Sequence, residues 1–568
     1  MSWLDPAAPR VGLGCMRLST DRDRDDARAV ATIEAALAAG AVVLDTARAY
    51  GHGDAELGHN ERLIARVLAG HPAASRVRIV TKGGMRRPGG RWEADGRAGT
   101  IVADAEASAE ALGRAPDVWL LHAVDPRVPL ATTLRAMAGL VERGLAGAVG
   151  LSNVSRAQLD EAAAIVPVAA VEVAVSVFED AALRGGVVAW CAARDVPLLA
   201  HAPLGGPGRA AKLVRDPALA AIAAERGATP PEIALAWLLD LAPCVVALPG
   251  ARRPETARSA LAAAGMVLGD GDRARLAARF PAGALARPAA RPAPAAVDGE
   301  VVLIMGVPGA GKSRAARGFV ERGYQRLNRD ERGGSLRGLA MALERLLAGG
   351  ARRVVLDNTY VDRATRSDVL TAAWPHRLPV RCVWFDTPLP AAQLNLSARL
   401  VEQLGHLPEP DELRRSKQAG VMAPGSQLRL VRALEAPGDD EGFAAIEVVA
   451  FARAADPSRG PGVVVALDDA AAIAGAVADD AGAPILALGW DPAAAADAEA
   501  RRAADLAGAH GRAIDVAICR HPAGPPVCWC RPPLPGLVAL WAHRRGVDLA
   551  RVTVVTSTPT MKTLARAF

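Results

Sequence analysis

The sequence predicts a multidomain α/β protein, and three observations lead to this prediction. The chain has 568 residues, and this length allows about three or four domains. Short runs of β-branched residues alternate along it with helical stretches rich in Ala, Leu and Arg. Residues 284–299, ALARPAARPAPAAVDG, are rich in Pro and Ala without a hydrophobic period, which is typical of a semi-extended linker. We therefore expect a domain over residues 1–283, a linker over 284–299, and two further α/β domains over 300–455 and 456–568.

The first domain is predicted to be a (β/α)₈ barrel, also called a TIM barrel. Eight apolar segments with helical stretches between them fit eight parallel strands. In such a barrel the catalytic side chains stand at the C-terminal ends of the strands. The predicted strands are 11–15, 42–45, 77–81, 118–121, 147–151, 168–173, 196–200 and 244–248.

Four candidate catalytic side chains follow these predicted strand ends. Asp45 and Tyr50 lie in LDTARAYG, Lys82 in TKGG and His122 in LLHAVDP. The chain holds only three Tyr and five Lys, so both residue types at motif positions are informative. A phenol, whose ordinary pKa is about 10, needs an adjacent cation to release its proton near neutrality. We therefore expect these side chains to meet at one mouth of the barrel as a proton-transfer site.

Over about residues 11–258 these motifs, in this order, resemble the aldo-keto reductases. The resemblance implies that Tyr50 donates a proton to the carbonyl of a small substrate and that Lys82 lowers the pKa of Tyr50. It also implies that Asp45 holds Lys82 and that His122 orients the carbonyl.

The resemblance also implies a nicotinamide cofactor. Ser152 and Asn153, in GLSN, match the family's carboxamide-binding pair. Arg252 and Arg253, in LPGARR, suit a 2′-phosphate and favour NADPH over NADH.

The cofactor side of the barrel departs from the family pattern at several positions. Glu172 and Val175 stand where relatives carry a Gln and a ring-stacking Tyr, and Ser259 and Ala260 replace a Glu-Asn pair. One alternative is therefore a barrel that keeps the fold without the reaction, acting as a cofactor sensor.

A phosphate-binding loop opens the second domain. The stretch 306–313, GVPGAGKS, follows the apolar run 301–305 and precedes a helix-permissive segment. In such a loop Gly306, Gly309 and Gly311 let backbone N–H groups close around phosphates, and Lys312 reaches the β- and γ-phosphates. The hydroxyl of Ser313 is the Mg²⁺ ligand, so the sequence predicts binding of ATP with Mg²⁺.

Together with this loop, three further motifs resemble the 5′-polynucleotide kinases over about residues 300–404. They are GYQRLNRDERGG, the Asp-Asn-Thr box at 357–359 and the Asn and Arg of AAQLNLSARL. The resemblance implies that Asp330 is the general base for a 5′-hydroxyl, that Asp357 lines the acceptor and metal side, and that Arg399 belongs to a lid over the phosphoryl group. Gly333 stands where some members carry an Arg.

The third domain contains a candidate metal cluster. Cys519, His521, Cys528 and Cys530 form the pattern C-x-H-x₆-C-x-C, which suits one four-coordinate structural Zn²⁺. Over about residues 462–568 this part resembles the haloacid-dehalogenase-type phosphatases with a zinc loop, which implies a small Rossmann-like domain.

The phosphatase motifs themselves are incomplete. VVVALDDAAA lacks the aspartyl nucleophile motif, Pro532 stands where a Lys is expected, and VVTSTPTMKT lacks acidic metal ligands. We interpret the domain as a pseudophosphatase used for scaffolding or substrate binding; a displaced nucleophile at Asp468 or Asp469 is the alternative.

The composition bears on the possible partners and the cellular compartment of the protein. The formal charge of +6 permits a nucleic-acid partner without requiring one. Seven Cys in so long a chain do not suggest a disulfide framework. Because no secretory or membrane-spanning pattern is present, we expect a cytoplasmic protein without a membrane partner. The oligomeric state stays open.

The expected function is an ATP-dependent kinase acting on 5′-hydroxyl ends of RNA or DNA, joined to an NADPH-dependent reductase of an aldehyde or ketone. The alternative is a metabolic fusion that reduces a small carbonyl compound and phosphorylates the resulting alcohol.

Overall fold

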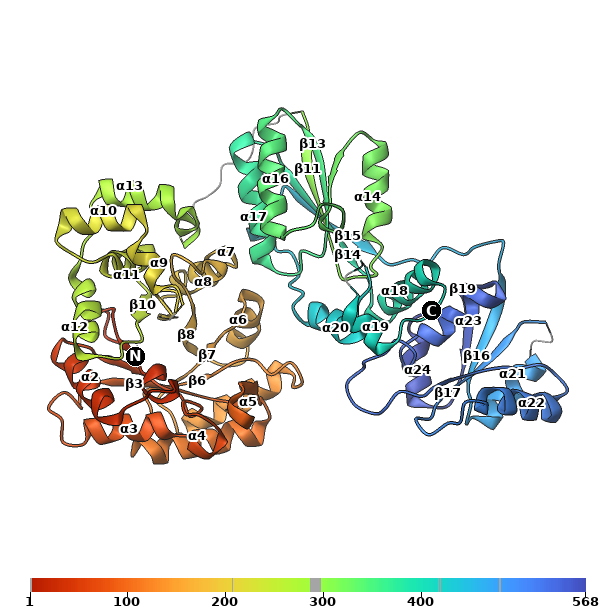
Figure 1. Cartoon of the computed structure of the whole chain (residues 1–568), viewed down its shortest axis with the longest axis horizontal. Coiled ribbons are helices and arrows are strands. Elements are labelled where there is room, and N and C mark those ends of the chain that lie inside the picture. The colour runs from red at the N-terminus through yellow and green to blue at the C-terminus, as the bar shows by residue number, and fades with distance from the viewer. Residues whose placement is uncertain (1–2, 207, 287–297, 417, 419, 480–481) are drawn as a thin grey trace. The chain divides into compact units, whose positions relative to one another are not determined.

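The chain forms two compact units in a computed structural model, residues 1–291 and residues 292–568. Figure 1 shows the first in red to yellow-green and the second in green to blue. The structure describes all residues except 1–2, 207, 287–297, 417, 419 and 480–481. The division falls inside the predicted linker, most of which lies outside the described residues. Each unit is considered by itself below.

The first unit contains the predicted (β/α)₈ barrel. Its eight-stranded sheet has the order β1-β2-β3-β6-β7-β8-β9-β10. A parallel bridge between Val11 and Ala247, with Gly12 N donating to Ala247 O at 2.9 Å, closes the sheet between its first and last strands. Every predicted run overlaps a strand: β1 (Leu13–Gly14), β2 (Val43–Asp45), β3 (Arg78–Gly83), β6 (Val118–Leu121), β7 (Val149–Ser152), β8 (Val168–Ala174), β9 (Leu198–His201) and β10 (Val245–Leu248).

The barrel strands are apolar on both sides because each side is covered. Leu120 packs inside the barrel with Val43, Val80 and Leu199. Its neighbour Trp119 instead joins the larger cluster between the strands and the surrounding helices. A strand buried on both faces reads as a continuous apolar run, which is why all eight were recognisable in the sequence.

Helices surround the barrel, and a hairpin follows β3. The helices are α1 (Met16–Thr20), α2 (Asp26–Ala38), α3 (His59–Leu68), α4 (Ala98–Leu112), α5 (Leu130–Glu142), α6 (Arg156–Ala163), α7 (Ala181–Arg184), α8 (Val187–Ala192), α9 (Ala210–Val214), α10 (Pro217–Arg226), α11 (Pro230–Leu241), α12 (Pro254–Ala262) and α13 (Asp270–Arg279). The hairpin pairs β4 (Met85–Arg86) with β5 (Glu93–Ala94) and carries residues toward the mouth of the barrel.

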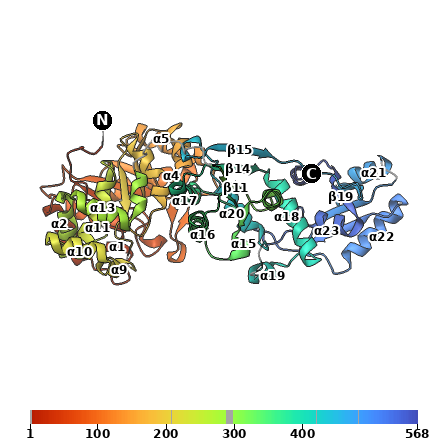
Figure 2. The same cartoon turned by 90° about the horizontal axis from the view of Figure 1, so that it is seen from above.

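The second unit begins with a five-stranded parallel sheet of order β12-β13-β11-β14-β15, in which Figure 2 shows β11, β14 and β15 side by side. The strands are β11 (Glu300–Met305), β12 (Gln325–Leu327), β13 (Arg353–Asp357), β14 (Val380–Asp386) and β15 (Ala445–Ala450). The sequence did not indicate β15, because it is an edge strand whose side chains are largely exposed and so lack a buried pattern.

Helices cover both faces of this sheet. One face packs against α16 (Leu336–Ala348) and α17 (Arg363–Ala373), and the other against α14 (Lys312–Glu321). The remaining helices of this part are α15 (Arg329–Arg332), α18 (Leu389–Leu404), α19 (Pro410–Arg415) and α20 (Pro424–Arg432). In a sheet of this order the crevice lies at the carboxyl ends of the strands beside β11, where the P-loop begins.

A four-stranded parallel sheet of order β18-β17-β16-β19 completes the second unit. Its elements are β16 (Gly460–Ala466), α21 (Ala470–Asp479), β17 (Ile485–Trp490), α22 (Ala498–His510), β18 (Asp515–Cys519), α23 (Gly536–Arg545), β19 (Val547–Val555) and α24 (Pro559–Ala565).

The two sheets of the second unit share apolar clusters. Leu396 and Leu400 of α18 pack with Trp529, and Leu394 packs with Ala539 of α23. This packing explains why residues 292–568 form one compact unit, although the sequence suggested two separate domains. In neither unit does a described helix have the length and apolarity needed to cross a bilayer.

Candidate active sites

A buried chain of polar contacts stands at the mouth of the barrel. Lys82 Nζ donates to the carboxylate of Asp45, to Thr46 O at 3.1 Å and to Tyr50 Oη at 3.2 Å. Asp45 ends β2, Tyr50 lies in the loop after it and Lys82 lies near the end of β3. His122 follows β6, and its ring centroid lies 5.8 Å from that of Tyr50. The structure thus brings together all four predicted catalytic side chains.

Burial and neighbouring charges set the protonation of this group. Burial opposes the charge of Lys82, but the carboxylates of Asp45 and Glu172 outweigh it and hold the pKa of Lys82 well above its ordinary value. Burial raises the pKa of Tyr50, against the influence of the Lys82 cation. Burial and then the Lys82 charge hold the pKa of His122 well below its ordinary value. The resting centre therefore contains a lysine cation, a protonated phenol and a neutral imidazole.

Glu172 is a further charged member of this centre. Its carboxylate lies 3.0 Å from Lys82 Nζ, although the angle is not that of a hydrogen bond, and both side chains are almost fully buried. Burial, and then the charge of Glu172, raise the pKa of Asp45. The sequence showed Glu172 only as a departure from the family pattern. Its place beside Lys82 depends on the register of β8 with β7, where it pairs with Ser152.

The candidate carboxamide-binding pair lies next to the catalytic group. Asn153 Nδ2 donates to His122 O at 3.0 Å and to Ser152 Oγ at 3.1 Å. Asn153 Oδ1 contacts His201 Nε2 at 3.0 Å. Burial and the Lys82 charge lower the pKa of His201 to about 4, so this imidazole is neutral at physiological pH. His201 ends β9; it was not among the predicted site residues, although its position at a strand end would have indicated it.

The two arginines expected at a 2′-phosphate differ in their surroundings. Arg252 forms ion pairs with Asp21, at 3.1 Å between Nε and Oδ2, and with Asp23. Arg253 precedes α12, and its backbone N–H donates to Thr256 Oγ1 at 3.3 Å. A phosphate at this position would therefore compete with two carboxylates for Arg252.

In the second unit the P-loop depends on its glycines. Gly306, Gly309 and Gly311 have φ values of +144°, +89° and +99°, a region that favours glycine. A Cβ at Gly309 would lie 2.1 Å from Ala392 O, and one at Gly306 would lie 2.8 Å from Phe385 O. The loop is braced from outside by Asn395 Nδ2, which donates to Gly309 O, and by Gln427 Nε2, which donates to Pro308 O, both at 2.8 Å.

The lysine of this loop is enclosed by it. Lys312 Nζ donates to Gly306 O and to Val307 O, both at 2.9 Å. Burial lowers the pKa of Lys312 to about 8, with Asp357 opposing the shift. Ser313 is exposed in the first turn of α14, where backbone N–H groups favour anions. The geometry of the loop therefore suits phosphate binding, with Lys312 and Ser313 in the first turn of the helix that follows.

The predicted acceptor residues converge on the same loop. Asp357 ends β13, is buried, and accepts from Arg326 and from Asn328 Nδ2, the latter at 3.2 Å. Asp330 lies exposed on α15, and Asn328, rather than Asp330, caps that helix. Arg399 of α18 donates from Nη2 to Gly420 O at 3.0 Å, while its Nε is buried without a hydrogen-bond partner among the described residues.

Electrostatic coupling shows that these charges are neighbours. The charge of Asp330 acts on the pKa values of both Lys312 and Arg399, and Arg399 acts on that of Lys312. Burial lowers the pKa of Arg399, which is therefore not a freely solvated helix arginine. The structure thus brings Lys312, Asp330, Asp357 and Arg399 to one place. The contact of Arg326 with Asp357 was not foreseen from the sequence.

The four candidate zinc ligands form a compact cluster. Their ligand atoms all lie within 4.8 Å of one another. The Sγ of Cys519 is 3.9 Å from that of Cys528 and 3.4 Å from that of Cys530, and His521 Nδ1 is 3.1 Å from Cys530 Sγ. Thiolates around a tetrahedral zinc, with Zn–S about 2.3 Å, lie roughly 3.8 Å apart. The donor set and its spacing therefore fit one Zn²⁺.

A second contact supports this cluster. His521 Nε2 lies 2.9 Å from Glu409 Oε2, at the start of α19. A carboxylate on the far nitrogen of a metal-binding histidine fixes its tautomer and leaves Nδ1 for the metal.

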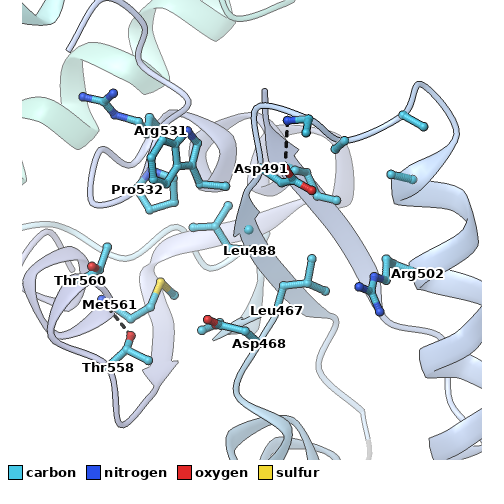
Figure 3. A pocket seen from close by; sticks show the side chains of 18 of the residues that line it. Leu467, Asp468, Leu488, Asp491, Arg502, Arg531, Pro532, Thr558, Thr560 and Met561 are labelled. Carbon is cyan, nitrogen blue, oxygen red and sulfur yellow. Dashed lines mark hydrogen bonds between the residues drawn. The ribbon is translucent and has the colours of Figure 1, made fainter. Parts of the chain in front are cut away.

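A cavity of about 1140 Å³ lies at the carboxyl edge of the last sheet (Figure 3). Asp468 lines it, whereas Asp469 caps α21 through Ala472 N at 3.0 Å and accepts from Ser557 Oγ at 2.8 Å. Its other labelled polar lining residues are Asp491, Arg502, Arg531, Thr558 and Thr560. Of the two candidate nucleophiles, only Asp468 faces the cavity.

Comparisons with known proteins support the two larger domains. Residues 10–278 match the Aldo/keto reductase family, and residues 301–409 match an AAA domain. An uncharacterized oxidoreductase of Schizosaccharomyces pombe is 27% identical over 270 residues, which are 46% of this chain and 84% of the relative.

Solved structures similar to the chain are also aldo-keto reductases. A thermostable aldo-keto reductase in complex with the inhibitor epalrestat is 30% identical, with a TM-score of 0.41, over 48% of this chain and 95% of that one. An aldo-keto reductase of Klebsiella pneumoniae in complex with NADPH is 25% identical, with a TM-score of 0.41, over 48% of this chain and 92% of that one. The two family matches agree with the polar centre at the barrel mouth and with the glycine-dependent loop after β11. The chain thus carries an aldo/keto reductase domain over residues 10–278 and a P-loop domain over residues 301–409.

Proposed function

We propose that the protein is a bifunctional enzyme: an NADPH-dependent reductase of an aldehyde or ketone and an ATP-dependent kinase of nucleic-acid 5′-hydroxyl ends. The hydrogen-bonded series from Asp45 through Lys82 to Tyr50 carries the first half of the proposal. The convergence of Lys312, Asp330 and Arg399 at the P-loop supports the second.

In the reductase, NADPH would supply the hydride, with Ser152 and Asn153 placed to bind its carboxamide. Tyr50 gives its proton to the developing alkoxide, and the cation of Lys82 stabilises the resulting phenolate. His122 is neutral at physiological pH, and its buried Nδ1 has no hydrogen-bond partner among the described residues. The imidazole can therefore orient the carbonyl by hydrogen bonding without competing with Tyr50 as the acid.

In the kinase, Lys312 and the P-loop N–H groups hold the phosphates of ATP, and Ser313 would ligate Mg²⁺. Asp330 accepts the proton of the acceptor hydroxyl, while Arg399 offsets charge on the transferred phosphoryl group. Asp330 is exposed on the short helix α15. A general base open to solvent suits the end of a polymer, and this observation favours a polynucleotide over a small enclosed acceptor.

The C-terminal part is proposed to be a haloacid-dehalogenase-like domain that no longer hydrolyses phosphate. Asp468 stands at the cavity, but the segment after β19 offers Ser557, Thr558 and Thr560 instead of carboxylates for a metal. The cysteine cluster would hold a structural Zn²⁺ that ties the loop after β18 to α19.

The kinase proposal is tested with γ-labelled ATP, Mg²⁺ and 5′-hydroxyl RNA or DNA oligonucleotides. We expect label on the oligonucleotide, lost in Lys312→Ala and Asp330→Ala, while Glu331→Ala on the same helix retains it. Label on small alcohols or sugars but on no oligonucleotide would favour the metabolic fusion. No transfer to either class, with ATP bound, would overturn the kinase proposal.

A further inference from the structure

Arg87, at the base of the hairpin that follows β3, is a buried cation beside the catalytic rings. Arg87 is only 6% exposed, and its Nε and Nη1 have no hydrogen-bond partner among the described residues. Its guanidinium carbon lies 3.7 Å from the centroid of the Trp92 ring. An attraction to an aromatic face offsets only part of the cost of burying a charge.

The ring of Trp92 joins this cation to the reaction centre. Its centroid lies 6.2 Å from that of Tyr50 and 5.6 Å from that of His122. The charge of Arg87 also contributes to the lowered pKa of His122. Trp92 is itself 46% exposed, so this group of rings borders open space. Arg87 is therefore separated from the proton donor by a single aromatic side chain.

The carboxylates of the same region are engaged elsewhere. Asp54 Oδ1 accepts from the backbone N–H of Arg87 at 2.6 Å, and no ion pair of the Arg87 side chain within 4.0 Å is found in the described part of the chain. The neighbouring arginines do face carboxylates: Arg86 and Arg97 pair with Asp95, and Arg127 pairs with Asp125. Arg87 thus forms no side-chain ion pair among the described residues and feels only the more distant charge of Asp54, whereas Arg86, Arg97 and Arg127 each pair directly with a carboxylate.

We infer that Arg87 is a specificity-determining residue that binds an anionic group, a carboxylate or a phosphate, on the carbonyl substrate. The inference rests on the proposed reductase function and narrows its substrates to aldehydes or ketones with a negative charge a few bonds from the carbonyl. The substrate anion supplies the direct ion pair that the Arg87 side chain does not form within the described residues, and the guanidinium offers N–H donors that match either anion. Trp92 provides the apolar wall between the anion and the reacting carbon.

The experiment compares substrates that differ only in the anion: succinic semialdehyde with butanal, and phosphoglycolaldehyde with glycolaldehyde. For the unmodified protein we expect kcat/KM to favour the anionic member of at least one pair by on the order of ten- to a hundredfold, the effect of a hydrogen bond to a charged group. The pair that shows the larger ratio identifies carboxylate or phosphate as the anion.

The variants assign this preference to one residue. In Arg87→Gln the ratio should fall to about one, mostly through KM, with activity on the neutral aldehyde changed less than about threefold. Arg91→Gln, an exposed arginine of the same hairpin, is the matched control and should keep the ratio. Arg87→Lys keeps the positive charge but lacks the planar pair of N–H donors, so it should retain part of the preference for the anionic substrate.

Two outcomes separate this inference from the proposed function. Equal reduction of both members of each pair by the unmodified protein would overturn the role of Arg87 and leave the reductase intact. Failure to reduce any of the four aldehydes would instead count against the reductase itself. Because the first comparison needs no variant, it decides the question even if Arg87→Gln does not fold.

Discussion

At the residue scale, the reductase depends on one buried lysine shared by three partners. Lys82 contacts Asp45, Tyr50 and Glu172 with almost no exposure to solvent. Because Asp45 and Glu172 both lie against its charge, Lys82 stabilises a phenolate less than a lysine with one acidic partner would. Proton transfer from Tyr50 and the titration of Asp45 therefore depend on the same contacts.

Replacement of Tyr50 by Phe should abolish the reductase without unfolding the barrel. General acid catalysis contributes on the order of 10²–10⁴ to the rate, and Tyr50 is the only phenol hydrogen-bonded to Lys82 among the described residues. We expect kcat to fall by that factor in an assay of NADPH consumption, while NADPH still binds in a fluorescence titration. Unchanged turnover would favour the interpretation of the barrel as a cofactor sensor.

Replacement of Glu172 by Gln should change how stability depends on pH. Burial and Glu172 raise the pKa of Asp45 in the folded state. As the pH rises, the Asp45 carboxyl group therefore loses its proton in the unfolded chain before it does so in the folded protein. This contribution to stability is complete below the unfolded pKa of Asp45 and is lost as the pH rises toward the raised value.

Without the Glu172 charge the pKa of Asp45 falls and this loss becomes smaller. We therefore expect the unfolding temperature of the first unit to decline with rising pH more steeply in the unmodified protein than in Glu172→Gln. Thermal unfolding followed by circular dichroism across acidic to mildly alkaline pH measures the difference. Parallel curves would show that the two carboxylates do not interact.

At the element scale, the P-loop and the cysteine loop, residues 519–530, are stabilised in different ways. The P-loop is a backbone structure, determined by positive φ values at Gly306, Gly309 and Gly311 and by the approach of Ala392 O. The cysteine loop depends on its side chains, which lie together at metal-ligand spacing.

Replacement of Gly309 by Ala should abolish binding of ATP. The new Cβ would lie 2.1 Å from Ala392 O at a φ of +89°, so the loop must move away from α18. Gly318→Ala within α14 is the matched control, because its Cβ meets only Arg322 Nη1 at 3.5 Å. There we expect a gain in stability of about 0.5–1 kcal/mol and normal binding. Titration with a fluorescent ATP analogue compares the two; normal affinity in Gly309→Ala would refute the argument.

Loss of one cluster thiol should remove the metal. The purified protein is expected to hold one Zn²⁺ per chain by mass spectrometry, and Cys528→Ser to hold little or none. Cys244→Ser, which changes a thiol of the first unit, should keep the metal. Because Trp529 packs in the cluster shared with α18, metal loss should also lower the unfolding temperature of the second unit. Equal metal content in both variants would exclude this site.

At the scale of the whole molecule, the chain forms two compact units, and the second unit contains both the five-stranded P-loop sheet and the four-stranded C-terminal sheet. The packing of α18 against Trp529 and α23 joins the P-loop part to the C-terminal part. Arg453 adds polar contacts between them, from Nη1 to Asn395 Oδ1 at 2.8 Å and from Nη2 to Ala567 O at 3.3 Å. Since Asn395 also donates to Gly309 O, the C-terminal part helps to hold the P-loop.

Fragments cut in the linker should therefore behave differently from fragments cut near residue 456. We expect fragments 1–286 and 298–568 each to fold, and NADPH to raise the unfolding temperature of the first only and ATP that of the second only. A fragment 298–455 would expose the apolar face of α18 and should be less stable and aggregate. Calorimetry and light scattering compare the three. A stable, monomeric 298–455 fragment would show that the two parts fold independently.

Much of this protein could be determined from its sequence alone. The barrel strands were recognisable because they are buried on both faces, and Asp45, Tyr50, Lys82 and His122 because barrel chemistry follows strand ends. The P-loop was recognisable because its backbone requires glycine at fixed spacing. The cysteine cluster was recognisable because its ligands are local in sequence.

Contacts between distant segments were decided only by the tertiary structure. Glu172 and His201 lie at the catalytic centre because of the register of their strands. Arg87 lies near it because the hairpin folds so that its guanidinium stacks on Trp92. The union of the last two predicted domains arises from apolar faces on α18 and α23 that local patterns cannot pair. Sequence periodicity reports which side of an element is buried, but the partner that buries it, and the charges left unpaired beside it, depend on the packing of the whole unit.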